Sequence, residues 1–82
     1  MEPRDVLKKA DALLVAGDAQ GAVAYYKTVA QFYAAQGFAL KSIAVWKQIL
    51  AIPGFDAEAR PQLITLYRSL GLEHDARALE EG

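Results

Sequence analysis

Hydrophobic residues recur along this chain at steps of three and four positions, the spacing of side chains on one face of an α-helix. Glycine and proline interrupt the pattern at intervals of helix length, because glycine readily ends a helix and proline cannot continue one. The pattern predicts an all-α fold with five helices in a single domain, 1–82. The expected helices cover residues 3–16, 19–36, 38–52, 57–70 and 72–81.

Individual residues predict how these helices begin. Pro3 suits a first turn, and the carboxylates of Asp18 and Asp56 are expected to cap the second and fourth helices by accepting backbone N–H groups. Pro61 lies beyond the first turn of the fourth helix, where it removes one helical hydrogen bond. We therefore expect this helix either to bend at Pro61 or to begin later than Ala57.

The second expected helix differs from the others because apolar residues surround most of its circumference. Only Lys27, Thr28 and Gln31 form a polar stripe along it. A helix of this kind needs partners on more than one side, so we expect it to lie in the middle of the fold.

The sequence also matches itself at two shifts. A shift of 34 residues aligns 33–37 with 67–71, and a shift of 20 residues aligns the first glycine hairpin with the second. Both shifts preserve a small residue five positions after a glycine. The glycine and small-residue pairs are Gly17 with Ala22, Gly37 with Ser42, and Gly71 with Ala76.

This order of aromatic, glycine, small, aliphatic and aromatic positions resembles the tetratricopeptide repeat (TPR) family. The residues that fit one full repeat are Tyr33, Gly37, Ser42, Ile43 and Trp46. The resemblance implies antiparallel helix hairpins, stacked as a short right-handed solenoid of about five helices, in which the small residues let paired helices approach closely. Because the first two hairpins are 20 residues apart instead of 34, it also implies that the second helix is shared by two repeats.

Composition and charge argue against several function classes. The chain has no Cys and a single histidine, His74, so thiolate chemistry is excluded and a catalytic relay would depend on one imidazole. Nine basic and ten acidic residues give a net charge of −1, which provides no field to attract nucleic acid or an anionic membrane. We expect a cytoplasmic protein that is not an enzyme, with no catalytic residue, metal, cofactor or membrane insertion, and His74 as a solvated turn residue.

The resemblance implies a function in binding another protein or peptide, in a groove lined by the second and fourth helices. Some TPR proteins hold a peptide's terminal carboxylate there with Lys and Asn; Lys27 fits, but Gln31 and Gln62 replace Asn. The family's groove positions fall on Lys27, Gln31, Ala35, Glu58, Gln62, Thr65, Arg68 and Ser69.

An alternative follows from the apolar content of 54%, which is high for so short a chain. Apolar residues on the first and last helices can form an end face that meets a second copy, or the next segment of a longer protein of which this chain is a part. The function is then self-association or capping. The residues expected on this end face are Leu7, Leu14, Val15, Leu72 and Leu79.

Overall fold

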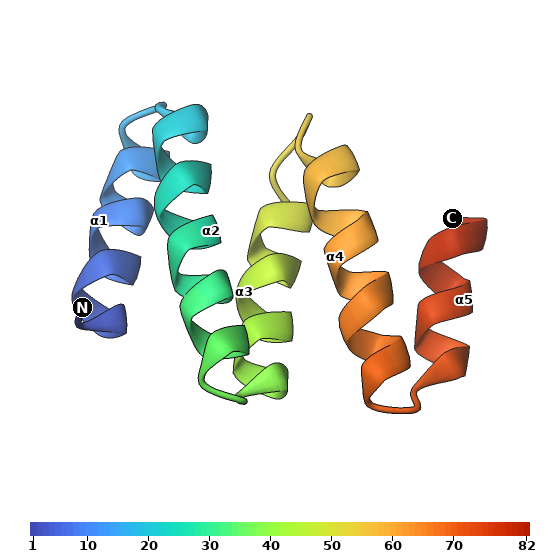
Figure 1. Ribbon diagram of the computed structural model, residues 1–82. Helices are drawn as coiled ribbons and strands as arrows, with labels where there is room; N and C mark the ends of the chain where they lie inside the picture. Colours follow the sequence, from blue (N-terminus) through green and yellow to red (C-terminus); the bar gives the residue numbers. More distant parts are fainter.

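The computed structural model covers residues 1–82 and contains five α-helices and no strands. Consecutive helices run in opposite directions, and each packs its backbone closely only against the helices next to it in the chain (Figure 1). The array measures 35 × 27 × 12 Å, so it is thin and has two broad faces. The helices are α1 (Pro3–Val15), α2 (Ala19–Ala35), α3 (Ala39–Leu50), α4 (Asp56–Ser69) and α5 (Glu73–Glu81).

All five expected helices are present, and their ends lie within two residues of the expected positions. Asp18 caps α2 as expected, because its Oδ1 accepts the Gly21 N–H at 2.9 Å. The prediction that Asp56 caps α4 is wrong. Asp56 is the first residue inside that helix, and Phe55 before it is the N-cap, with a carbonyl that accepts the N–H groups of Glu58 and Ala59.

Of the two alternatives expected at Pro61, a start later than Ala57 is wrong, since the helix begins at Asp56 and continues through Pro61 to Ser69. Pro61 has no N–H to offer the carbonyl of Ala57, four residues earlier. Both residues are exposed, so water can replace the missing hydrogen bond. This position tolerates proline because its backbone lies at the surface.

Three of the turns share one geometry, which the glycines make possible. Gly37 has φ of +81°, a left-handed conformation that glycine adopts without strain. The Phe38 N–H then reaches back to the Tyr33 carbonyl at 2.9 Å and closes the end of α2. Equivalent bonds follow Gly17 and Gly71.

The small residue after each of these glycines is fully buried. Ala22, Ser42 and Ala76 all have an exposed fraction of 0%. The Ser42 hydroxyl donates to the Ala30 carbonyl of α2 at 2.7 Å, which ties α3 to its neighbour. A larger side chain at these positions would separate the paired helices, so the small residues set the close packing.

Helix α2 packs against both α1 and α3, so it has partners on two sides as expected, although α3 is the middle helix of the array. Its Tyr26 hydroxyl donates to the Asp11 carboxylate of α1. Burial, assisted by this hydrogen bond and by the Asp11 charge, raises the pKa of Tyr26 to about 12. The core continues through Trp46 and Ile49 of α3 to Leu63 of α4. None of the helices combines the length and apolar character needed to cross a membrane.

Candidate functional site

Two exposed stripes of side chains lie on α2 and α4. On α4, Glu58, Gln62, Thr65 and Ser69 follow one another at steps of four, three and four, which places them on one face. All four residues are exposed. On α2, the same steps connect Gln20, Ala24, Lys27 and Gln31, and Ala35 continues the stripe.

An ion pair joins the two stripes across the array. Lys27 Nζ lies 3.0 Å from Glu58 Oε2, although 31 positions separate the residues in the chain. Beside the pair is a shallow depression of about 190 Å³, and of the residues predicted for the groove only Lys27 and Glu58 line it. We call the depression together with the two stripes the α2–α4 groove. The depression is lined by Gln20, Val23, Ala24, Lys27, Phe55 and Glu58.

The remaining α4 positions differ in what their side chains offer a partner. The hydroxyls of Thr65 and Ser69 donate to carbonyls of their own helix, at 3.0 and 2.7 Å. Each oxygen retains acceptor capacity. Gln62 forms no hydrogen bond through its side chain, so its amide is free to donate and accept.

Arg68 contacts α5. Its Nε lies 3.0 Å from Glu73, and its Nη2 lies 2.5 Å from Glu80. The hydrogen bonds to Glu80 and then Glu73 raise the pKa of the guanidinium above its already high value. Arg68 therefore links α4 to α5, with two carboxylates already in place around its charge.

The five residues expected at the end face fall into two groups. Leu7 and Leu79 are half-buried and pack against the core. Leu14, Val15 and Leu72 are exposed, and Val15 is the most open of the large apolar residues, with 90% of its surface accessible. The exposed residues of this set are therefore divided between the end of α1 and the turn before α5, and other large apolar residues, such as Leu40 at 70%, are exposed elsewhere.

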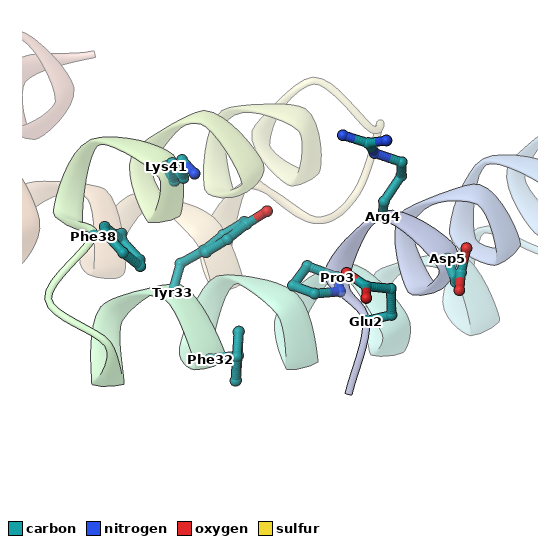
Figure 2. Close-up of a pocket in the computed structure, with 8 residues that line it drawn as sticks. All are labelled: Glu2, Pro3, Arg4, Asp5, Phe32, Tyr33, Phe38 and Lys41. Carbon is teal, nitrogen blue, oxygen red and sulfur yellow. The ribbon is translucent and has the colours of Figure 1, made fainter.

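A larger cavity, which the sequence did not indicate, lies between α1 and α3 beside the end of α2 (Figure 2). Its volume is about 550 Å³. Lys41 of α3 lies over two aromatic rings there, with its Nζ 5.5 Å from the ring centroid of Tyr33 and 5.0 Å from that of Phe38. The lining residues are Glu2, Pro3, Arg4, Asp5, Phe32, Tyr33, Phe38 and Lys41.

Outside these two surfaces, we find no cluster of catalytic or metal-ligating residue types. His74 is exposed in the first turn of α5. No group of three or more His, Asp or Glu side chains is placed to hold a metal ion. The α2–α4 groove and the α1–α3 cavity are thus the two concave surfaces of the molecule.

Comparison of the chain with protein-family models, curated proteins and solved structures identified no match.

Proposed function

We propose that this chain is a TPR-like interaction module that binds a segment of a partner protein along the α2–α4 groove. The observation that carries the proposal is the alignment of the two exposed stripes, with Lys27 of α2 paired to Glu58 of α4. Such an alignment presents polar side chains from two separate helices to one partner. A right-handed solenoid and a cytoplasmic location are parts of the same proposal.

The repeated turns support the TPR-like interpretation. Glycine with positive φ and a fully buried small residue five positions later occur together three times. In helical repeats, each hairpin packs on its neighbours and the outer surfaces of successive helices form an extended binding face. The α2–α4 groove is such a face on this chain.

The chemistry of the groove favours an uncharged polar segment. The charges of Lys27 and Glu58 cancel, and Arg68 is already paired with two carboxylates on α5. Gln31 and Gln62 are exposed and uncharged. An extended peptide offers backbone N–H and C=O groups along its length, and glutamine amides can bind both.

Site-specific photocrosslinking tests this proposal. A benzophenone amino acid replaces Gln31 or Gln62 in the groove, and Gln48 on the exposed side of α3 provides the matched control. We expect a protein from the native cell extract to crosslink at the two groove positions and not at position 48. Thr65→Arg, which places a bulky charge in the groove, should abolish the crosslink while the protein stays folded.

The proposal fails if position 48 crosslinks as well as positions 31 and 62, or if Thr65→Arg has no effect. Self-association is a second candidate, favoured by the 90% exposure of Val15. Sedimentation velocity distinguishes it, because Val15→Lys should dissolve an oligomer that Thr65→Arg leaves intact. A monomer at all concentrations excludes this second candidate.

A further inference from the structure

The cavity between α1 and α3 has the size of a small-molecule site. Its volume of about 550 Å³ falls within the range of roughly 300–1,000 Å³ that is usual for ligand pockets. The rings of Phe32 and Tyr33 on α2 and of Phe38 just before α3 form its apolar side, and charged side chains at the starts of α1 and α3 form its polar side. A ligand that fills this cavity needs both an apolar part and a charged or polar group.

Lys41 occupies an electrostatically unfavourable position in this cavity. It lies in the first turn of α3, where unpaired backbone N–H groups give the helix end a partial positive charge. No side chain caps this helix, and its first turn contains no acidic residue. Lys41 also forms no ion pair with any carboxylate of the chain. A cation at a helix N-terminus without a counter-ion is a local conflict of the kind that marks functional sites.

Arg4 supplies a second cation without an ion-pair partner. In Figure 2 the Arg4 and Lys41 side chains lie along the same side of the cavity, and the Tyr33 ring lies below them between α2 and α3, with its hydroxyl end directed toward the start of α1. The Tyr33 hydroxyl has no hydrogen-bond partner in the chain. Three donor groups that form no hydrogen bond or ion pair within the chain therefore border one space.

The charges of the lining favour a ligand with at most one negative charge. Glu2 and Asp5 also line the cavity, so its two cations are balanced by two carboxylates. In Figure 2, Pro3 lies between the Tyr33 ring and Glu2, and Asp5 lies farther along α1. A dianion such as a phosphate would be repelled by these carboxylates, and a monoanion would meet Lys41 and Arg4 with less opposition.

We propose that the α1–α3 cavity binds a small organic carboxylate. Its negative group lies near Lys41, Arg4 and the N-terminus of α3, and its hydrocarbon part rests against the Tyr33 and Phe38 rings. The aromatic rings hold the lysine ammonium in place through cation–π contacts, so its N–H donors are oriented before the ligand arrives. This site is separate from the α2–α4 groove and does not depend on its function.

Phenylacetate is a suitable probe, since it joins one carboxylate to one aromatic ring. Titration of the full chain, followed by ¹⁵N–¹H NMR, should shift the amide signals of the first turn of α3 with a Kd of about 1 mM or tighter. Neutral 2-phenylacetamide has the same shape and should bind at least about tenfold more weakly, because charge-assisted hydrogen bonds are lost. Phenyl phosphate should also bind more weakly than phenylacetate.

Three variants test the assigned residues. Lys41→Gln and Arg4→Gln should each raise the Kd for phenylacetate at least about tenfold. Lys47→Gln, near the other end of the same helix, removes a matched exposed charge and should leave the Kd unchanged. All three should melt within about 5 °C of the parent protein, since none removes a buried group.

The proposal is overturned if phenylacetate causes no shift at about 20 mM, or if 2-phenylacetamide or phenyl phosphate binds as tightly. It is also overturned if Lys41→Gln and Lys47→Gln have the same Kd. If Lys41→Gln unfolds, the Arg4→Gln titration decides the question, because the Arg4 side chain forms no ion pair that the fold requires.

Discussion

The thin array makes the packing of α4 sensitive to the loss of a single side chain. Leu63 is fully buried, and the backbone of α4 packs closely only against α3 and α5. Leu63→Ala removes three carbon atoms, and there is no further layer that could move into the space. We expect a loss of about 3 kcal/mol in the free energy of unfolding, within the range of roughly 2–5 kcal/mol for buried leucines.

This loss is large compared with the total stability. A chain of 82 residues is expected to have a free energy of unfolding of about 4–12 kcal/mol. A loss of about 3 kcal/mol lowers the melting temperature of a domain of this size by roughly 12–24 °C. Leu63→Ala should therefore melt well below the parent protein.

Far-UV circular dichroism during thermal and urea unfolding measures the effect. Leu40→Ala is the matched control, because Leu40 is 70% exposed on α3 and its truncation should cost less than about 0.5 kcal/mol. A loss below about 1 kcal/mol for Leu63→Ala would refute the assignment of this residue to the core. An equal loss for the two variants would refute it as well.

Three further predictions concern a turn, a cap and a buried tyrosine. Gly37→Ala should lower the free energy of unfolding in urea by about 1–2 kcal/mol, because φ is +81° at this position and alanine is strained there. A new Cβ meets no atom within 4 Å, so backbone strain is the only expected cause, and a loss under about 0.3 kcal/mol would contradict it. Asp18→Ala removes the acceptor for the Gly21 N–H and should cost about 1 kcal/mol, whereas Asp56→Ala, which removes no cap, should cost less; equal losses would argue against this difference. The folded state binds the Tyr26 proton more tightly than the unfolded state, with a pKa of about 12 against 10. The stability from this group is therefore complete below pH 10 and is lost as the pH rises to 12, and urea unfolding of Tyr26→Phe should lack this part of the decline; an identical pH profile for both proteins would contradict it.

Local signals were sufficient to predict the helices of this chain. Glycine at a helix end and an apolar pattern of helical period depend on backbone conformation and burial, which neighbouring residues largely determine. The two predicted caps show what the local sequence cannot predict. Asp18 and Asp56 look alike in the sequence, but Phe55 packs against the core and its carbonyl starts the helix one residue before Asp56. Such a tertiary contact is not visible in the local sequence.

The candidate site was predictable only in part for a similar reason. Helical spacing indicates which residues share a face, so the α4 stripe of Glu58, Gln62, Thr65 and Ser69 could be predicted. It does not indicate where a long side chain extends. Arg68 reaches α5 because Glu73 and Glu80 lie within hydrogen-bond distance, and that contact depends on how α5 packs.

One residue of the cavity, Lys41, is unusual in the sequence itself, but its link to a cavity becomes clear only in the structure. Lys41 in the first turn of a helix without acidic residues is a local conflict that can be recognised from the expected helix boundaries. Only the fold places Arg4, 37 positions earlier in the chain, in the lining of the same cavity. Periodicity cannot predict this shared lining because no repeat relates α1 to α3 at these residues.

The groove and the cavity use opposite sides of the same helix. On α2, Gln31 belongs to the groove and Tyr33 to the cavity, and two positions correspond to about 200° around an α-helix. A ligand bound in the cavity could change the affinity of the groove only by rotating or shifting α2. That movement would break the hydrogen bonds from Ser42 to Ala30 and from Tyr26 to Asp11, which fix α2 to the helices on either side. The two surfaces should therefore bind independently, and a variant that disables one should leave the affinity of the other unchanged.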